Sequence, residues 1–588
     1  MSFHPNDVAR RARVSSVALA VGFVLLIGAF FRTQILQHQK YVLQSEENRL
    51  RPIPLPAPRG IIYDRKGEII AENLPGYSVS ITAPSVDSLR ASLAQLSSTL
   101  QLTKDQVDAA VRRFRRAPTR PTVVLADASI DVISVLEEHR LDYPRLIIQS
   151  VPKRYYPDGP SVASFVGYTG EITEAELNRP EFEGYKPGQQ LGKGGLEKQY
   201  EAQLHGREGV RFDEVDARGR PVRGEGPRPD LTPEGAPPLF TNIDLDLQKF
   251  AVAVFGDSLQ GGVVALDPNT GGVLALYSAP SFDPNKFTGG IPAEYYKKLL
   301  TDERRPLVNK AVQGRYPPGS TFKLATAVTG LTDGVVSLTD HMPVPCTGGY
   351  QYGSRYFRCW EKRGHGSLSL YGAIKHSCDV YFYQLGLKIK LARLIAGGIS
   401  LGFREKSGID LPEENLARFP YAVKYYNEKY GRNWSNAETL NLAIGQGANS
   451  QTVVNMAKFY SALATDGRAP RPKIARGSTE RKQIFTLTPV QDSTIKAALA
   501  GVLEGGGTAA ASALTGVVLA GKTGTAQNPG KADHGWFIGF APANNPKIVV
   551  AVMLEFGGHG SRAAHIASSI IGHYLHVQPA SEAIETGG

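Results

Sequence analysis

Ser320 and Lys323 are the two residues of this sequence whose types and spacing best fit nucleophilic chemistry. A Pro-Pro-Gly turn precedes Ser320, and the residues that follow, Leu324 to Val328, favour a helix. Ser320 is therefore predicted to open a helix, where free N–H groups and the helix dipole stabilise an oxyanion. Lys323 follows three residues later on the same helical face. A lysine whose pKa is depressed by burial can remove the hydroxyl proton.

The Ser-x-x-Lys spacing is weak by itself, because it occurs at two other places in the chain. Ser150 and Lys153 enclose a proline and precede extended sequence. Ser493 and Lys496 lie in an ordinary helical pattern, where an exposed lysine is the simpler interpretation. Two further motifs downstream distinguish Ser320 from these matches.

These motifs are Ser377-Cys-Asp379 and Lys522-Thr-Gly-Thr525. Ser-x-Asp is common and also occurs at Ser85 and Ser281, whereas Lys-Thr-Gly occurs once. Lys-Thr-Gly follows the apolar run Val517–Ala520, as expected for a strand that borders an active site. Together with Ser-x-x-Lys, these are the motifs of penicillin-binding proteins and class A β-lactamases.

On these motifs the chain resembles the penicillin-binding transpeptidases, and the resemblance covers nearly the whole sequence after residue 32. Further matches lie at 59–65, 194–201, 214–220, 267–268, 445–447, 507–509 and 534–537. The sequence lacks a Glu-Asp-x-x-Phe glycosyltransferase signature, so it resembles a monofunctional, class B member. Residues 360–366, 377–379 and 408–412 resemble the elongation branch, the penicillin-binding protein 2 group. A division-specific class B transpeptidase is the alternative.

The resemblance implies a reaction and its partners. The reaction would be D,D-transpeptidation of peptidoglycan during cell elongation and shape maintenance, with carboxypeptidase activity as a side reaction. Stem peptides would be the substrates and β-lactams the covalent inhibitors. Catalysis would need no cofactor. A SEDS-family glycosyltransferase and other membrane proteins of the elongation complex would be the partners.

The resemblance also assigns roles to single residues. Ser320 would attack the carbonyl of a terminal D-alanyl-D-alanine, and Lys323 would be the general base. Ser377 would pass a proton toward the leaving amine. Many relatives carry asparagine where this chain has Asp379, so the role of Asp379 stays open.

The third motif would bind the substrate. Backbone N–H groups of Ser320 and Thr525 would form the oxyanion hole. Lys522 and the hydroxyls of Thr523 and Thr525 would hold the substrate carboxylate, with Gly524 between them.

All three cysteines lie close together in the sequence, as Cys346, Cys359 and Cys378, and His365 lies among them. Three thiolates and an imidazole suit tetrahedral Zn²⁺. A Cys346–Cys359 disulfide is the alternative for a chain outside the cell. The elongation branch binds zinc at a comparable place, and the resemblance matches His365 and Cys378 to its ligands. A structural zinc ion here would fix the loop that carries the second motif.

The N-terminus predicts a membrane anchor. Arg10, Arg11 and Arg13 precede an uncharged stretch that Arg32 closes, which defines a transmembrane segment at 14–32. A cleaved signal peptide would need a small-x-small site after a shorter apolar run. The arginines predict a cytoplasmic tail at 1–13 and everything after the anchor outside. We therefore expect a single-pass protein of the bacterial cytoplasmic membrane, with its catalytic domain on the outer, periplasmic side.

The exported chain divides into a pedestal (dimerisation-like) domain at 33–239, a transpeptidase domain at 240–577 and a disordered tail at 578–588. Leucines predict helix between 85 and 116. Apolar runs predict strands at 262–267, 272–277, 517–525, 536–540 and 548–554, with helices between 320 and 465. The turn Pro268-Asn-Thr-Gly271 predicts that the first two strands form a hairpin. The fold class is thus α/β, of α+β type: an antiparallel sheet flanked by helices, β-lactamase-like.

Composition and domain organisation bear on four other possible functions: a nucleic-acid-binding protein, a β-lactamase, a β-lactam sensor and a scaffold. The net charge is +11, but no basic run is interleaved with aromatic residues, so nucleic acid is not expected as a partner. A serine β-lactamase would need neither a pedestal nor an anchor. A β-lactam sensor would need a larger cytoplasmic part. A scaffold that activates a SEDS glycosyltransferase is compatible with transpeptidation.

Overall fold

The computed structural model describes residues 5–41, 50–118, 120–214, 229–431, 434–477, 479–528, 530–578 and 580. The chain forms two compact units, and neither is a single segment. The first comprises Met1–Ala57, Gly76–Val151 and Arg207–Glu234, and the second comprises Pro58–Pro75, Pro152–Gly206 and Gly235–Gly588. The sequence-based boundary after residue 239 stays a prediction, because the predicted pedestal contributes to both units.

The N-terminal helix α1 (Pro5–Phe31) continues into one π-helical turn, Arg32–Leu36. The stretch Val8–Leu36 is long and apolar enough to cross a membrane, and it contains the predicted segment 14–32. Of the predicted cytoplasmic tail, residues 1–4 lie outside the described residues, and the rest belongs to α1.

The first unit contains the helices α3 (Val86–Leu100), α4 (Lys104–Arg116) and α5 (Ile130–Glu138). It also contains the strands β1 (Leu50–Leu55), β4 (Thr122–Leu125) and β8 (Gly209–Glu214), with parts of β3 (Ile69–Ile81) and β5 (Leu146–Tyr155). β1 pairs antiparallel with β8, and β3 with β4. Leu89, Leu93 and Leu96 are buried as predicted. The helix is nevertheless interrupted, because Gln101 adopts a left-handed φ of 50° and a capping box at Thr103 starts α4.

A five-stranded sheet in the order β11-β10-β18-β17-β16 lies at the centre of the second unit, and all of its strand pairs are antiparallel. The strands are β10 (Gly261–Leu266), β11 (Val273–Ala279), β16 (Ala520–Ala526), β17 (His534–Ala541) and β18 (Ile548–Leu554). The predicted hairpin and the three predicted later strands are confirmed, with β16 starting at Ala520 rather than Val517. β16 lies at one edge of the sheet.

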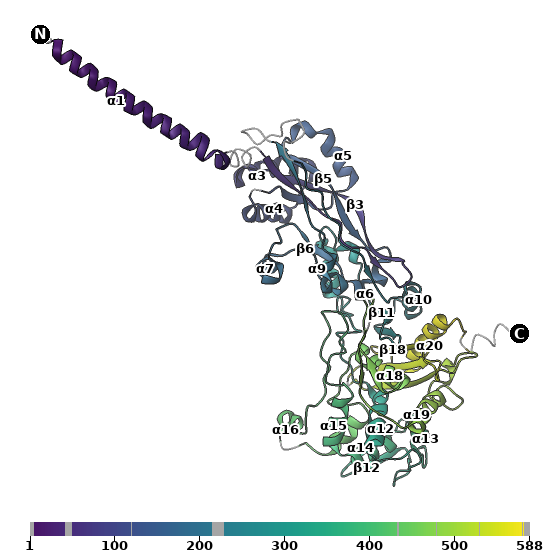
Figure 1. Cartoon of the computed structure of the whole chain (residues 1–588). Helices are drawn as coiled ribbons and strands as arrows, with labels where there is room; N and C mark the ends of the chain where they lie inside the picture. The colour runs from purple at the N-terminus through teal and green to yellow at the C-terminus, as the bar shows by residue number, and fades with distance from the viewer. Residues whose placement is uncertain are drawn as a thin grey trace. The chain divides into compact units, whose positions relative to one another are not determined.

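Helices cover both faces of this sheet. Alternate residues of β10 and β18 enter two separate hydrophobic clusters, as the two-residue period of a strand requires. α10 (Leu245–Phe255) and α20 (Ser561–Leu575) pack on one face. α18 (Val453–Ala464) packs on the other, where α12 (Lys323–Thr332) and α14 (Asp379–Ile389) extend the same cluster. Figure 1 shows α20 beside β18, and α12 near α14.

The second unit also contains shorter elements. Its other helices include α6 (Ala163–Val166), α7 (Glu174–Leu177), α8 (Gly195–Gln199), α9 (Glu201–Leu204), α11 (Ala293–Thr301), α13 (Leu370–Lys375), α15 (Leu391–Ser400), α16 (Lys424–Tyr430), α17 (Ala437–Ala443) and α19 (Pro489–Gly501). Its small strands are β2 (Ile62–Tyr63), β6 (Thr169–Glu171), β7 (Gln190–Gly192), β9 (Leu239–Phe240), β12 (Gly349–Tyr352), β13 (Arg355–Arg358), β14 (Arg468–Pro470) and β15 (Arg481–Gln483). The predicted tail 578–588 lies mostly outside the described residues. Of it, Gln578 and Ala580 form backbone hydrogen bonds with Thr515 and Ala513.

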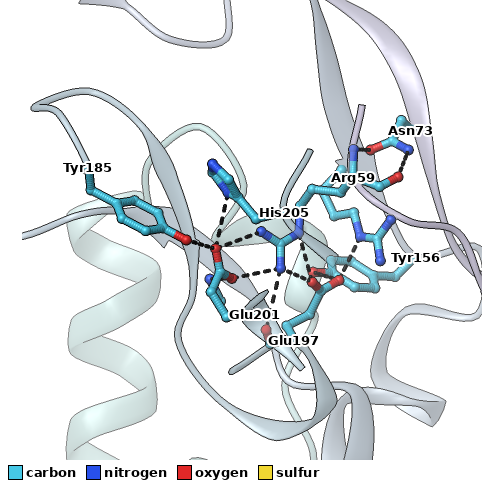
Figure 2. Close-up of polar contacts among 9 residues, drawn as sticks. Arg59, Asn73, Tyr156, Tyr185, Glu197, Glu201 and His205 are labelled. Carbon is cyan, nitrogen blue, oxygen red and sulfur yellow. Dashed lines mark hydrogen bonds and ion pairs between the residues drawn. The ribbon is translucent and has the colours of Figure 1, made fainter. Parts of the chain in front are cut away.

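A network of buried charges in the second unit centres on Glu197 of α8 (Figure 2). Its carboxylate accepts hydrogen bonds from Nε of Arg59 at 2.9 Å and from Nε of Arg154 at 2.6 Å. Arg59 also pairs with Glu201 at 2.8 Å. Two guanidinium groups thus balance two carboxylates in the interior. Burial tends to raise the pKa of Glu197, but the two guanidinium groups outweigh it and hold the pKa below its usual range.

Glu201 ties further segments into the same network. Its carboxylate accepts hydrogen bonds from the Tyr185 hydroxyl at 2.9 Å and the Gly192 N–H at 2.8 Å, and lies 3.1 Å from Nδ1 of His205. Burial would raise the pKa of Glu201, but His205, Arg59 and Gly192 lower it to about 2. Residues 59, 154 and 185–205 are thereby joined by ionic contacts rather than by apolar packing alone (Figure 2).

Candidate active site

The turn that carries Ser320 is fixed by neighbouring elements. Ser320 lies in one 3-10 turn, Gly319–Phe322, which runs directly into α12. The Nε1–H group of Trp536 on β17 donates to the carbonyl of Pro317 at 3.0 Å, and the Gly319 N–H donates to the carbonyl of Gly445 at 3.1 Å. The predicted helix start is confirmed, and the half-buried Ser320 stands at its first turn.

Gly319 brings this turn against the third motif. Its φ of 55° is left-handed, and a Cβ atom here would lie 2.5 Å from the backbone oxygen of Thr525 on β16. Only glycine allows both the backbone conformation and this close approach. The first and third motifs are therefore in direct contact.

Lys323 joins the first motif to the second. Its side chain is fully buried at the start of α12. The Nζ group donates to the backbone carbonyl of Ser377 at 2.7 Å and to its Oγ at 3.2 Å, and lies 2.8 Å from Oδ1 of Asp379. Three polar partners thus hold the ammonium in one place.

The second motif is held in an unusual conformation. Ser377 has a left-handed φ of 53°, which costs a non-glycine residue on the order of 1 kcal/mol and is typical of functional sites. Asp379 begins α14, and its Oδ2 accepts a hydrogen bond from the Trp360 N–H at 3.1 Å. Burial raises the pKa of Asp379 above its usual range, although the nearby Lys323 charge opposes this.

Lys522 lies on the edge strand β16 and is fully buried. Its Nζ group donates to the backbone carbonyl of Thr523 at 3.1 Å. Burial, reinforced by the positive charge of Lys323, holds the pKa of Lys522 well below its usual range. Lys323 rather than Lys522 pairs with Asp379, so Lys522 lies in a buried, positively charged setting that disfavours its protonated form.

Thr508 is a residue of this site to which the sequence reasoning gave no role. Its hydroxyl oxygen lies 2.6 Å from that of Thr523, at hydrogen-bonding distance. Thr508 belongs to a Gly-rich turn after α19, in the segment 507–509 that carries part of the family resemblance. No local spacing pattern could have linked the two hydroxyls, because the contact is tertiary.

The four predicted metal ligands come together. The ligand atoms of Cys346, Cys359, His365 and Cys378 all lie within 4.8 Å of one another. Nδ1 of His365 lies 3.7 Å from the Cys346 sulfur and 3.6 Å from that of Cys359. The cysteines are buried and free, so the alternative Cys346–Cys359 disulfide is absent from the structure. Three sulfurs and one imidazole form a donor set that fits tetrahedral zinc.

The other Ser-x-x-Lys matches do not form such a site. Ser493 and Lys496 lie on α19, where Lys496 pairs with Asp492 at 2.9 Å and donates to the Thr465 carbonyl at 3.0 Å. Ser150 lies on strand β5. Only Ser320 shares its surroundings with the second and third motifs.

Comparisons with known proteins agree with this geometry. Residues 261–572 match the family model of the penicillin-binding protein transpeptidase domain, and residues 54–231 match that of the penicillin-binding protein dimerisation domain. The chain is 33% identical to peptidoglycan D,D-transpeptidase MrdA of Acinetobacter baumannii, over 97% of this chain and 89% of the relative.

Solved structures are also similar. A complex between penicillin-binding protein PBP2 and MreC from Helicobacter pylori aligns with a TM-score of 0.79 and 26% identity, over 90% of this chain and 99% of the other. A structure of a peptidoglycan synthase complex, described as coordinating polymerization and crosslinking, aligns with a TM-score of 0.71 and 30% identity, over 97% and 99%. The chain therefore belongs to the penicillin-binding protein transpeptidases, the family that its three motifs predicted.

Proposed function

We propose that this chain is a peptidoglycan D,D-transpeptidase of the elongation branch and that Ser320 is its nucleophile. One observation carries the assignment. Buried Lys323 contacts both Ser377 and Asp379 and follows Ser320 by three residues at a helix start. The relatives and solved structures that align over most of the chain support the same reaction.

The first half-reaction forms an acyl-enzyme. Lys323 acts as the general base and accepts the proton of Ser320 as Oγ attacks the carbonyl of the penultimate D-alanine. The N–H groups of Ser320 and Thr525 stabilise the oxyanion. The C–N bond then breaks, Ser377 passes a proton to the leaving amine, and D-alanine departs. A neighbouring stem-peptide amine attacks the ester and completes the cross-link, while the proton returns to Ser320.

Charge balance gives Lys522 its role. The carboxylate of Asp379 pairs with Lys323, and burial, together with the positive charge of Lys323, depresses the pKa of Lys522. A substrate carboxylate supplies a second negative charge, which favours the protonated form of Lys522. The hydroxyls of Thr523 and Thr525 complete the carboxylate site, and Gly524 lies between them.

The proposal includes location and partners. The arginines at 10, 11 and 13 keep the N-terminus in the cytoplasm and place the chain that follows the membrane anchor on the outer side of the cytoplasmic membrane. A SEDS-family glycosyltransferase and other elongation-complex membrane proteins are the proposed partners. The alignment with a peptidoglycan synthase complex and with a PBP2 solved together with MreC supports this.

Mass mapping with fluorescent penicillin tests the function. We expect the full chain, purified in detergent, to form a long-lived covalent adduct on the peptide that contains Ser320. Purified uncross-linked peptidoglycan should become cross-linked, with release of D-alanine. Rapid loss of the adduct would favour a β-lactamase. A folded protein that takes up no label would argue against transpeptidation and would leave the activation of a SEDS glycosyltransferase, as a scaffold, as its function.

We expect Thr508→Val to slow acylation by penicillin about tenfold, because the change removes one hydrogen bond at a charged substrate group. Thr508 is a positioning residue: when it donates to Thr523, the Thr523 hydroxyl proton is directed at the substrate carboxylate. Thr508→Ser should restore most of the rate. The acylation rate of a substrate analogue with an amide in place of the carboxylate should not change with Thr508→Val. An equal loss of acylation rate with penicillin and with this analogue would contradict the positioning role.

Cys346, Cys359, His365 and Cys378 would hold a structural zinc ion next to the second motif, since Cys378 lies between Ser377 and Asp379. We expect one zinc per chain by elemental analysis and a lower melting temperature after chelation. Cys346→Ser should lose the metal. His376→Ala is the matched control, because its ring lies 6.0 Å from that of His365 but outside the ligand set. A metal-free protein whose melting temperature is indifferent to chelators would refute the zinc site.

A further inference from the structure

Three tyrosines gather on and just before α16, which none of the motifs includes. Tyr421 and Tyr430 are 38% and 43% exposed, and Tyr425 is half-buried. We call these three side chains the tyrosine platform. A short surface helix normally presents polar side chains, so a group of exposed aromatic rings marks a binding surface.

Buried Tyr426 supports the platform from within. Its ring lies 5.4 Å from the ring of Tyr425 and 6.3 Å from that of Tyr430, measured between centroids. Tyr421 in turn packs edge-to-face on Tyr425 at 6.2 Å. The rings are therefore held in fixed positions before any ligand binds, which lowers the entropic cost of binding.

Positive charges surround the same rings. The guanidinium of Arg404 lies 5.1 Å from the centroid of Tyr421, and Nζ of Lys429 lies 4.9 Å from that of Tyr430. Lys424 is 74% exposed and pairs with Glu428 at 3.4 Å. Aromatic rings with excess positive charge fit a ligand that offers flat apolar faces and carboxylates. Pyranose rings pack their C–H faces on aromatic rings, and peptidoglycan stem peptides carry carboxylates.

The chain path sets an upper limit on the distance between the rings under the platform and the turn that carries the nucleophile. Tyr426 contacts Trp434 at 5.5 Å, and the chain from Trp434 runs through α17 to Gly445, whose carbonyl accepts the N–H of Gly319. Seven helical residues and four others span at most about 25 Å. An extended stem peptide of five residues spans about 17 Å. This upper limit is longer than the stem peptide, so a glycan strand whose stem peptide ends at Ser320 would contact the platform with sugars beyond the one that bears the stem peptide.

We propose that the tyrosine platform binds the glycan strand that bears the donor stem peptide of uncross-linked peptidoglycan. This inference rests on the proposed function and adds a second contact, so that the enzyme holds the polymer as well as the peptide. Small D-alanyl-D-alanine substrates and penicillin carry no glycan, so they lack this second contact.

The test compares polymer with small ligands, using the full chain in detergent. For the double variant Tyr421→Ala/Tyr430→Ala we expect the KM for uncross-linked peptidoglycan to rise at least about tenfold. The penicillin acylation rate should stay unchanged. Penicillin-blocked wild type should co-sediment with peptide-free glycan strands, and the double variant should not. Tyr421→Phe/Tyr430→Phe keeps the rings and should behave as wild type. Tyr296→Ala, which removes a ring that is 41% exposed on α11, is the matched control.

Each outcome decides the proposal. Unchanged co-sedimentation and KM in the double variant would overturn it. Loss of a co-purifying membrane protein with intact glycan binding would identify a protein contact and also overturn it. Glycan binding is measured separately from acylation, so wild type that binds peptide-free strands but accepts no penicillin would refute the proposed function while keeping the platform. The single variants Tyr421→Ala and Tyr430→Ala give an independent reading if the double variant unfolds.

Discussion

The Ser320→Ala variant is expected to form no covalent adduct with penicillin, and its cross-linking rate should fall by at least about 10³-fold. Without the Oγ atom no acyl-enzyme bond can form. The contacts of Lys323 with Ser377 and Asp379 do not involve the Ser320 side chain, so the site keeps its geometry. Gel fluorescence after labelling measures the adduct, and analysis of cross-linked muropeptides measures the rate.

The chain offers its own controls for this experiment. Ser150→Ala and Ser493→Ala remove the serines of the other two Ser-x-x-Lys matches, and both side chains are exposed. Each variant should label like wild type. An adduct on the Ser320→Ala protein, or loss of labelling in either control, would place the nucleophile elsewhere.

Glu197→Gln is expected to lower the free energy of unfolding of the second unit by about 3–5 kcal/mol. Glu197 is fully buried, and its carboxylate contacts the guanidinium groups of both Arg59 and Arg154. An amide of nearly the same size leaves these cations with only one neutralising carboxylate, that of Glu201. Thermal unfolding followed by circular dichroism or calorimetry measures the loss.

Glu234→Gln is the matched control for the same chemical change. Glu234 faces Arg207 at 3.8 Å, with side chains 70% and 87% exposed, so water screens the pair. Its melting temperature should equal that of wild type. Equal effects of the two substitutions would show that the buried network does not stabilise the unit.

The same network makes stability depend on pH with a defined sign. The pKa of Glu201 is lowered from its ordinary 4.5 to about 2 in the folded chain. Its stabilisation is therefore complete above pH 4.5 and is lost as the pH falls toward 2. Acid unfolding should begin in this window.

Local features of the sequence predicted much of the fold. The Pro-Asn-Thr-Gly turn between two apolar runs defines the β10–β11 hairpin, and three apolar runs define the closing strands. The Pro-Pro-Gly turn before Ser320 likewise predicts a helix start. Each of these signals can be found in the sequence because it is contained in a few neighbouring residues.

Contacts between distant residues were beyond such reasoning. The Lys323–Asp379 pair and the Thr508–Thr523 contact depend on how separate segments pack. The left-handed backbone of Ser377 departs from what serine prefers, and only the surrounding structure enforces it. The helical spacing predicted over 85–116 is confirmed by two helices, α3 and α4, but the leucine set gave no sign of the break at Gln101. Its last leucine, Leu100, directly precedes that break and is only half-buried.

The interleaved order of the two units governs how the chain can be cut and how it is synthesised. Ile62, Ile70 and Phe165, far ahead of the catalytic motifs, share one hydrophobic cluster with Leu266, Val549 and Met553. A fragment that begins at residue 240 would expose the apolar surface these residues cover and would aggregate. On the ribosome, segments 58–75 and 152–206 emerge long before β17 and β18, so they must wait for partners made last. The apolar residues of these early segments therefore stay uncovered, and open to premature association, until the final strands have been made.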